Sequence, residues 1–223
     1  MLKAQKRLTK RELKEDKFVT FYFQAQDYFY RNTKLIAGLA VALVVVIVAV
    51  YALSHMSASN QEAAQLELTR AKVAFNQQDY SRAIEMLLLV VSEYGGTASG
   101  KESRFYLANA YFENKDYANA ERYYQEFLGS HGDDILESSA LAGIAACLEE
   151  KQDYAGAAAS YERAASEYAK VFLTPLHLLN SARCYVLAGD SEKAKSILNR
   201  IINEYENSAV KTDAEILLAE LPS

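Results

Sequence analysis

Three histidines and two cysteines are the side chains of this 223-residue chain best suited to bind a metal or act as nucleophiles. The histidines His55, His131 and His177 lack the short paired spacings that bring metal ligands together. Only His131 has acidic neighbours, Asp133 and Asp134, and a polar turn between helices explains the same residues. The sequence contains no phosphate-binding glycine loop and no nucleophile elbow. We therefore expect no catalytic residue, no metal, no cofactor and no small-molecule substrate.

The two cysteines, Cys147 and Cys184, are separated by 37 residues. This spacing places them at one position of successive repeats, where Val73 and Ala110 stand in earlier ones. Equivalent residues of stacked helices lie about 8 to 10 Å apart, beyond the limit of about 7 Å on the Cα separation for a disulfide. We expect two buried free thiols, although an oxidising compartment would make a bridge worth testing.

The same period runs through most of the chain, because Asp recurs every 37 residues at Asp79, Asp116, Asp153 and Asp190. An Ala follows each Asp four residues later, and another Ala precedes it by eight residues. Small residues let paired helices approach closely, and an Asp before a helix accepts hydrogen bonds from its free amide groups. Only two prolines and nine glycines interrupt the chain, which favours helix. These features predict an all-α solenoid of stacked helix pairs.

Residues 35–53 form an uncharged apolar run of nineteen residues, long enough to cross most of a membrane as a helix. A buried core helix would show a polar stripe, and a signal peptide has a shorter apolar stretch of about 7 to 15 residues. Small residues after the run resemble a cleavage site, so processing stays open as an alternative. The pattern predicts one transmembrane helix.

The flanks of this run differ in charge. Residues 1–34 carry nine Lys and Arg against four acids, whereas residues 54–223 carry fifteen against twenty-five. Basic flanks tend to stay in the cytoplasm, so we expect a cytoplasmic N-terminus. The larger part would then lie outside the cytoplasm, which in a Gram-negative bacterium is the periplasm, with the span in the inner membrane.

The basic leader, residues 1–34, carries a helix signal in Thr9 and Glu12, which form a capping box and predict a helix start near Lys10. Its aromatic residues recur at helical spacing, as expected for an amphipathic face at the membrane interface. Docking on a membrane partner is the alternative. We expect no nucleic-acid binding, because acids interrupt the basic residues and the membrane offers a nearer anionic surface.

The repeat resembles the tetratricopeptide repeat (TPR). The resemblance lies in Ala71, Gln78-Asp79-Tyr80 and Ala83-Ile84, which recur as Leu107-Ala108, Tyr111, Asp116-Tyr117 and Ala120. The polar residues 54–60 predict a short linker, and the repeat predicts four helix pairs at about residues 61–97, 98–134, 135–171 and 172–207, with a capping helix at 208–221. The period of 37 exceeds the usual 34 and predicts about three extra residues in each turn between repeats.

A basic leader, one span and an acidic TPR domain together resemble the YfgM-type ancillary subunits of the bacterial Sec translocon. More distant similarity is to the Tol-Pal coordinator and to BamD-type lipoproteins, which are anchored differently. The resemblance implies a membrane-anchored periplasmic adaptor for protein partners, such as the Sec translocon, a periplasmic chaperone or a client. Its role would be that of a translocon-associated chaperone or envelope assembly factor. The alternative is a structural or assembly subunit that binds mainly through its leader and span.

In TPR arrays the first helix of each pair lines a concave groove. By that resemblance the partner-binding residues are Leu68, Lys72, Phe75, Asn76, Phe105, Asn109, Phe112, Glu113 and Arg183. The three phenylalanines would form an aromatic patch for an apolar helix or an extended segment. Equally, these rings could pack between repeats. Recognition of a terminal carboxylate is not expected, because Phe105 stands where the carboxylate clamp of TPRs uses Lys.

Overall fold

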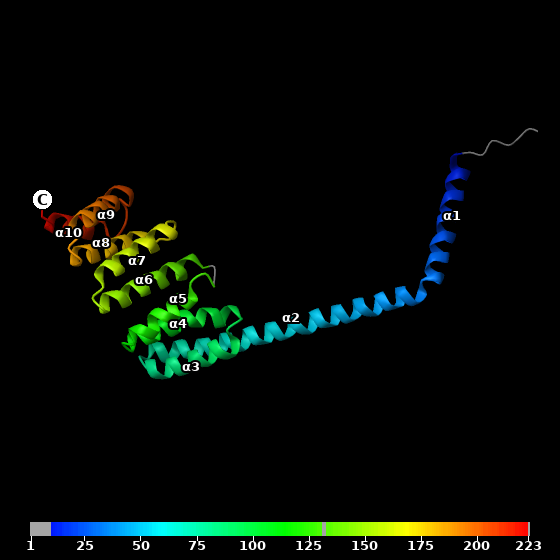
Figure 1. Ribbon diagram of the computed structural model, residues 1–223, viewed down its shortest axis with the longest axis horizontal. Helices are drawn as coiled ribbons and strands as arrows, with labels where there is room; N and C mark the ends of the chain where they lie inside the picture. Colours follow the sequence, from blue (N-terminus) through cyan, green and yellow to red (C-terminus); the bar gives the residue numbers. More distant parts are fainter. Residues whose placement is uncertain (1–9, 131–132, 223) are drawn as a thin grey trace, which may run out of the picture. The chain divides into compact units, whose positions relative to one another are not determined.

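The computed structural model describes residues 10–130 and 133–222, with side chains from residue 18 onward. The described residues form ten helices and no strand (Figure 1), which confirms the predicted all-α class. By its contacts the chain divides into two compact parts, Met1–Met56 and Ser57–Ser223.

The first part contains helix α1 (Lys10–Arg31) and the beginning of α2 (Thr33–Asn76). Helix α1 begins where the capping box predicted, although Thr9 itself lies outside the described residues. Helix α2 runs without interruption through residues 54–60, so the predicted linker is helical and not a break in the chain. The reason is local, because no Gly or Pro occurs between Gly38 and Gly95.

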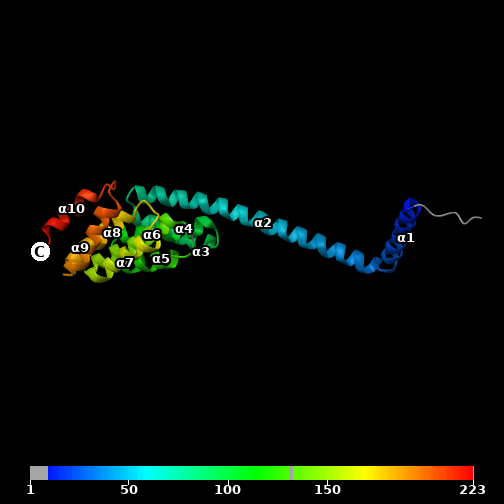
Figure 2. The same ribbon diagram turned by 90° about the horizontal axis from the view of Figure 1, so that it is seen from above.

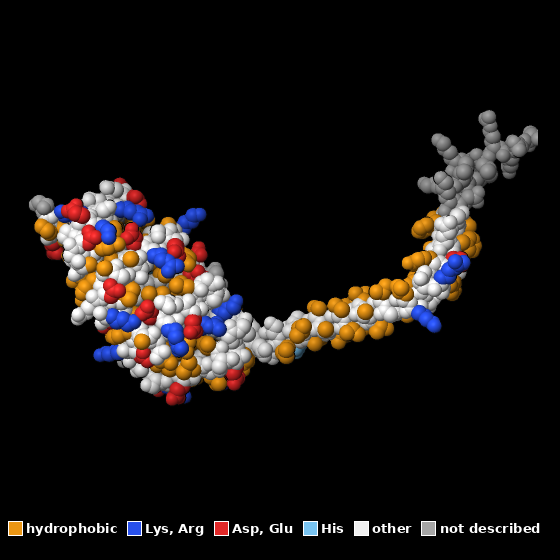
Figure 3. Space-filling model, in the orientation of Figure 1, with side chains coloured by type: hydrophobic (Ala, Val, Ile, Leu, Met, Phe, Trp, Pro, Cys, Tyr) orange, Lys and Arg blue, Asp and Glu red, His pale blue; other side chains and the backbone are white. Residues whose placement is uncertain are grey.

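The apolar half of α2 is the one segment among the described residues that is long and apolar enough to cross a membrane. Its side chains are exposed along its length, from Leu35 at 60% to Leu53 at 62%. Figure 3 shows hydrophobic side chains along this stretch of the helix. Such exposure is inconsistent with a core helix of a soluble domain. Length and composition of this kind are shared by membrane anchors and by signal sequences.

The second part is a stack of helix pairs, here called repeats 1 to 4, followed by a single helix. Repeat 1 consists of the end of α2 and α3 (Tyr80–Tyr94). The others are α4 (Ala98–Glu113) with α5 (Tyr117–Phe127), α6 (Asp134–Glu150) with α7 (Tyr154–Glu167), and α8 (Thr174–Leu187) with α9 (Ser191–Glu204), and α10 (Lys211–Glu220) closes the chain. From α3 to α10, each helix packs against the next in sequence, as Figures 1 and 2 show.

The two repeated small positions carry alanine because both are fully buried in the stack, where packed helices leave room only for a small side chain. All eight residues are 0% exposed: Ala71, Ala83, Ala108, Ala120, Ala145, Ala157, Ala182 and Ala194. The Asp of each repeat caps the second helix as predicted, accepting a hydrogen bond from the third residue after it. The four distances are 3.2 Å for Asp79, 3.2 Å for Asp116, 3.0 Å for Asp153 and 3.2 Å for Asp190.

The residue before each capping Asp has a left-handed backbone. Its φ angle is 63° in Gln78, 62° in Lys115, 63° in Gln152 and 81° in Gly189. A side chain at such a φ clashes with its own backbone, at a cost of about 1 to 2 kcal/mol that glycine does not incur. Repeats 1 to 3 are therefore strained at this turn, and repeat 4 is not.

Exchanging the residues at this position should change stability in opposite directions. We expect Gly189→Ala to lower the free energy of unfolding by about 1 kcal/mol and Lys115→Gly to raise it by about 0.5 kcal/mol, net of the extra chain entropy of glycine. A Cβ on Gly189 would meet no atom within 4 Å, so the effect is one of backbone alone. Urea unfolding measures both values. The control Lys115→Ala keeps a side chain at this φ and should hardly change the free energy of unfolding. If Gly189→Ala and Lys115→Gly changed that free energy in the same direction, the explanation would be refuted.

The extra residues of the 37-residue period lie mostly between repeats. Turns inside a repeat have three residues, whereas the connections at 128–133, 168–173 and 205–210 have six. The connection after α3 has only three residues, because α3 is longer than its counterpart in repeat 2. Helix α3 has 15 residues, whereas α5 has 11. At the other end, α10 covers repeat 4 as the predicted cap, with Ala214 at 0% exposure and Leu217 and Leu218 packed on the same core.

Candidate functional site

Two of the nine predicted groove residues are core residues. Leu68 is 0% exposed and Phe105 is 9% exposed, and both belong to the hydrophobic core that repeats 1 to 3 share. The Phe105 ring packs against Phe127, with 5.5 Å between ring centroids, and against Tyr124 at 6.0 Å. Phe105 therefore faces the second helix of its own pair. The prediction is therefore wrong at Leu68 and Phe105, which no ligand can reach in the folded array.

The other two phenylalanines are partly buried and pack inside their own repeats. Phe75 meets Tyr80 edge-on at 5.5 Å, and Phe112 meets Tyr117 in the same way at 5.4 Å. Each of these ring pairs connects the two helices on either side of the turn that carries the capping Asp. The three phenylalanines thus form no open aromatic patch. Their rings pack in or against the hydrophobic core that repeats 1 to 3 share, as the alternative of packing rings had it.

Two polar members of the predicted set, Lys72 and Asn109, are half-buried and bonded to other side chains of the array. Lys72 Nζ lies 2.7 Å from Glu102 Oε1 and 4.0 Å from the centroid of the Tyr106 ring. Burial lowers the pKa of Lys72, but its hydrogen bonds to Glu102 and Tyr106 outweigh that effect and raise the pKa, so the ammonium stays charged. The Tyr124 hydroxyl donates a hydrogen bond of 2.5 Å to Asn109 Oδ1. Lys72 therefore joins two first helices, and Asn109 joins the helices of one pair.

The remaining predicted residues, Asn76, Glu113 and Arg183, are exposed. Arg183 forms no ion pair with any described residue. It lines a hollow of about 300 Å³ between α8 and α10, together with Leu179, Asp213, Ile216, Leu217 and Glu220. The hollow has an apolar floor, one guanidinium and two carboxylates. It is the place where the structure brings a predicted groove residue into an open site.

Helix α8 differs from the earlier first helices in what it exposes. Leu176, 40% exposed, occupies the position held by Gln65, Glu102 and Ser139 in repeats 1 to 3. Leu187, 59% exposed, occupies the position held by Asn76, Glu113 and Glu150. Phe172 at 76% and Ile216 at 54% add two more exposed apolar side chains. We call Phe172, Leu176, Arg183, Leu187 and Ile216 the C-terminal face.

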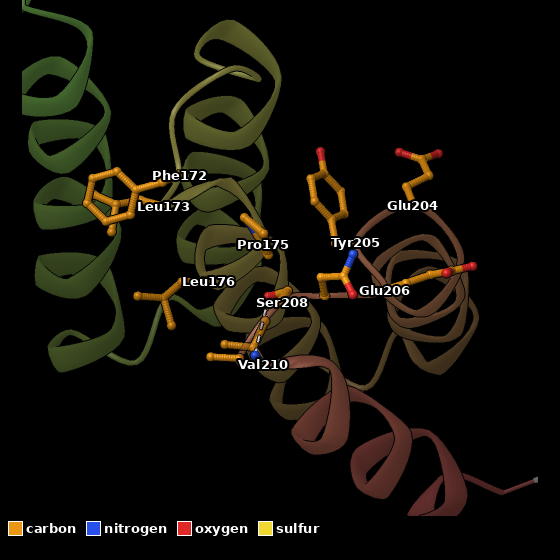
Figure 4. A pocket seen from close by; sticks show the side chains of 11 residues that line it. Phe172, Leu173, Pro175, Leu176, Glu204, Tyr205, Glu206, Ser208 and Val210 are labelled. Atoms are coloured by element: carbon orange, nitrogen blue, oxygen red, sulfur yellow. Dashed lines mark hydrogen bonds between the residues drawn. The ribbon is translucent and has the colours of Figure 1, made fainter.

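A second hollow, of about 490 Å³, adjoins this face at the start of α8. Figure 4 shows Phe172, Leu173 and Leu176 on one side of it and the end of α9, with Glu204, Tyr205 and Glu206, on the other. Leu176 lies three residues before Leu179, which lines the first hollow, so the two hollows follow each other along α8. Together they make an elongated apolar surface with carboxylates at its margins.

Sequence reasoning missed most of this surface. Arg183 was predicted, but Leu176, Leu187 and Ile216 were not, although the 37-residue alignment of the repeats contains the signal. Leucine at two positions that are otherwise polar or small marks repeat 4 as different. The contribution of α10 was not visible in that alignment, because its role was taken to be that of a cap.

The residues that could do chemistry are enclosed. Cys147 and Cys184 are free thiols at 0% exposure, as expected. Burial raises the pKa of each to about 12, so neither is a thiolate at neutral pH. Among the described residues no group of three or more His, Cys, Asp or Glu could hold a metal ion. His131, the histidine of the predicted cluster with Asp133 and Asp134, lies outside the described residues.

His177 is a buried imidazole whose burial should make the array less stable in acid. Its ring is 4% exposed, and neither ring nitrogen has a hydrogen-bond partner within the described chain. Burial lowers its pKa below 6.5, so the folded protein excludes a proton that the unfolded chain accepts. We expect the free energy of unfolding to fall as pH drops below about 6.5, by at most about 1.4 kcal/mol per pH unit for this one group. Urea titrations between pH 7.5 and 5.5 measure it.

The variant His177→Leu should flatten that dependence, because it removes the proton acceptor and keeps an apolar side chain. His55→Gln, a change at an exposed residue of α2, serves as the control and should leave the slope as it is. An unchanged slope in His177→Leu would assign the acid sensitivity to other groups.

Comparison with known proteins agrees with this architecture. A family model described as a tetratricopeptide repeat-like domain matches residues 26–173, and a tetratricopeptide repeat model matches residues 148–221. Two solved structures of a putative kinesin light chain with nearly identical TPR-like repeats from Podosopora anserina, one of them a point variant, are similar. Each has a TM-score of 0.55 and 15% identity, and the matches cover 70% of this chain and 82% or 83% of those chains. No curated protein matches the chain.

At 15% identity the solved structures show the fold alone. The family models carry more, because the first of them spans more than half of the chain and the second continues to the cap. Tetratricopeptide repeats are typically non-catalytic scaffolds for protein interaction, in keeping with an array whose thiols and His177 are enclosed. The chain belongs to the tetratricopeptide repeat-like family.

Proposed function

We propose that this protein is a single-span membrane-anchored adaptor that binds a segment of a partner protein on its C-terminal face. Protein binding follows from the family, and the choice of face rests on one observation. Apolar side chains stand exposed around Arg183 at positions where the other repeats carry polar or small residues. Exposed apolar residues lining a hollow with few polar groups are typical of a docking surface.

Charge indicates the chemistry of the partner segment. Glu206, Asp213 and Glu220 are exposed around the two hollows and form no ion pair with any described residue, whereas Arg183 is the single cation among the lining residues. Residues 54–223 carry ten more acids than bases. Complementary charge favours a segment with Lys or Arg beside its apolar side chains. We infer an apolar, basic-flanked helix or extended strand as the bound element.

The anchor is supported by the exposed apolar half of α2 and by the basic leader before it. With the basic flank in the cytoplasm, the repeats lie outside it, in the periplasm of a Gram-negative bacterium, with the span in the inner membrane. The resemblance to YfgM-type subunits then supports a role beside the Sec translocon, where the adaptor would hold a periplasmic chaperone or a client.

Cysteine labelling in intact cells tests the topology. The native thiols are buried and give little background, so single cysteines can be added at Asn207 and at Gln24, both exposed. An impermeant maleimide should label Asn207→Cys once the outer membrane is opened and Gln24→Cys only after the inner membrane is also opened. The reverse order would place the repeats in the cytoplasm and end the proposal.

Photocrosslinking tests the face. A photoreactive phenylalanine analogue at Leu176, Leu187 or Ile216 should capture the same partner, and one at Asn199, exposed on the second helix of repeat 4, should not. Leu187→Asp should reduce capture from Ile216 at least tenfold, because it places a charge on the apolar surface. Capture from Asn199 alone would show that the partner binds elsewhere.

A second candidate is favoured by helix α1, whose aromatic side chains are exposed. Phe18 is 73%, Phe21 68% and Phe29 60% exposed. A structural subunit of a membrane complex would use these rings and the span for its main contacts. The photoreactive analogue at Phe21, compared with Leu187 in the same full-length protein, separates the candidates: partner capture from Phe21 alone would favour the second.

A further inference from the structure

The outer side of repeat 1 exposes positions that every other repeat buries. Leu66 is 53% exposed, whereas its counterparts Ser103, Ala140 and His177 are 0%, 0% and 4% exposed. Val73 is 51% exposed, whereas its counterparts Ala110, Cys147 and Cys184 are all 0% exposed. In repeats 2 to 4 the preceding helix pair covers these positions. Within the Ser57–Ser223 part no helix pair precedes repeat 1, so these positions stay exposed there.

Helix α3 extends the same surface. Leu89 is 51% exposed and stands where the later second helices carry Glu126, Arg163 and Arg200. Those three residues form surface ion pairs four residues along their helices, at 3.8, 2.6 and 2.9 Å. An exposed leucine in place of a solvated charge is unfavourable in water and favourable under a partner.

These residues form one surface. Leu66 and Val73 are seven residues apart and share a face of α2, and Met86 and Leu89 share a face of α3. A hollow of about 250 Å³ brings Val73 and Met86 together, with Arg70 and Arg82 beside them. We call Leu66, Val73, Met86 and Leu89 the N-terminal edge. Solenoids require a covering unit at each end, and the described chain supplies one, α10, only at the C-terminal end.

We propose that the N-terminal edge binds the same edge of a second copy of this chain. Head-to-tail stacking of copies is blocked, because α10 occupies the edge that would have to receive repeat 1. Two N-terminal edges therefore meet each other. On α2 the contact continues the interface that already joins successive repeats, because Leu66 and Val73 stand at positions that repeats 2 to 4 bury.

The spacing on α2 suits self-pairing. Ser59, Ala63, Leu66, Arg70 and Val73 follow each other at intervals of four and three residues, the repeat by which two parallel helices bring identical positions together. The one charge in this series is balanced, because Arg70 Nη1 lies 2.6 Å from Glu67 Oε1 on the same helix. Arg70 of one copy would therefore not meet Arg70 of the other as an unpaired charge.

The Met1–Met56 part gives independent support. Counted at the same intervals, four of the six positions in its apolar segment are small, Gly38, Ala42, Ala49 and Ala52, and the other two are Leu35 and Val45. Small residues let helices approach closely inside a membrane, where association depends on such packing. Two copies anchored in one membrane in the same direction have parallel spans. This support rests on the proposed anchor, whereas the exposure of the N-terminal edge does not.

Disulfide crosslinking of the full-length protein in native membranes tests the contact. Single cysteines replace Leu66 or Val73, and Asn199→Cys, exposed on the second helix of repeat 4 and away from this edge, is the control. The native Cys147 and Cys184 are buried, so the parent protein should give no crosslink. Mild oxidation should yield a disulfide-linked dimer at positions 66 and 73, at least tenfold more than at 199.

A charge variant supplies the second measurement. Leu66→Glu with Val73→Glu should convert the detergent-solubilised dimer to monomer in light scattering, while circular dichroism still shows the folded helical array because both residues are exposed within one chain. Equal crosslinking at all three positions would mean random collision and would overturn the proposal. So would a monomeric parent protein, or a crosslink to a different protein in place of the dimer. Because these readouts report the mass of the complex and not the side of the membrane, they are independent of the topology test.

Discussion

Replacing Gly143 by Ala is expected to lower the free energy of unfolding by about 3 kcal/mol, the upper part of the usual range for overpacking a core. A Cβ on Gly143 would lie within 2.7 Å of Cζ of Tyr124 and of both neighbouring ring carbons. The ring cannot move aside easily, because its hydroxyl is bonded to Asn109 and its face packs near Phe105. Helix α6 would have to move away from α5.

Urea unfolding of the soluble repeats, residues 57–223, measures this effect. The control is Gly96→Ala, because a Cβ at exposed Gly96 meets no atom within 4 Å. A second test removes the ring: Tyr124→Leu introduces the residue found at this position in repeats 1 and 4, Leu87 and Leu198. Gly143→Ala should cost far less in that background. If the two substitutions simply added, the clash would not be the cause.

Replacing Phe127 by Ala should cost about 3 to 5 kcal/mol, the range for deleting a buried aromatic side chain. Phe127 is 0% exposed and lies 5.5 Å from the ring of Phe105, in the core that repeats 1 to 3 share. The cavity would open at the junction of two repeats, so we expect a lower urea midpoint for the whole array.

Phe172→Ala is the matched control for Phe127→Ala. Phe172 is 76% exposed, and its truncation should change the free energy of unfolding by no more than about 0.5 kcal/mol. If the C-terminal face binds a partner, the same control should weaken photocrosslinking from Leu187. A large loss of stability in Phe172→Ala, or none in Phe127→Ala, would contradict the burial on which both expectations rest.

The repeat architecture could be predicted because its signals are local and recur. A capping aspartate such as Asp116 and a small residue such as Ala120 do the same work in every repeat, so four weak signals reinforced each other. The left-handed turn followed from no such signal, because Gln78, Lys115 and Gln152 are ordinary residues at a position where glycine alone is unstrained.

The binding surface was harder to predict, because alignment to a repeat says which positions are equivalent and not which way each side chain points. Leu68 and Phe105 are buried, whereas Leu179, at the same position of repeat 4, lines the hollow between α8 and α10. Whether a position faces the groove or the core depends on the rotation of the helix, which packing decides. The departures of Leu176 and Leu187 from polar neighbours were readable in the sequence.

The contact between Tyr124 and Gly143 has a consequence for the order of the repeats. Aligned by the 37-residue period, the same contact pairs Leu87 with Tyr106 and Tyr161 with Asn180. Exchanging repeats 2 and 3 would set Tyr161 against Tyr106 and leave Leu87 facing Gly143, a collision at one junction and a void at another. The helix pairs have the same architecture, but each junction depends on its own matched pair of large and small residues. A chain with repeats 2 and 3 exchanged would keep every capping aspartate and every small alanine, but its repeats would not pack well at these junctions.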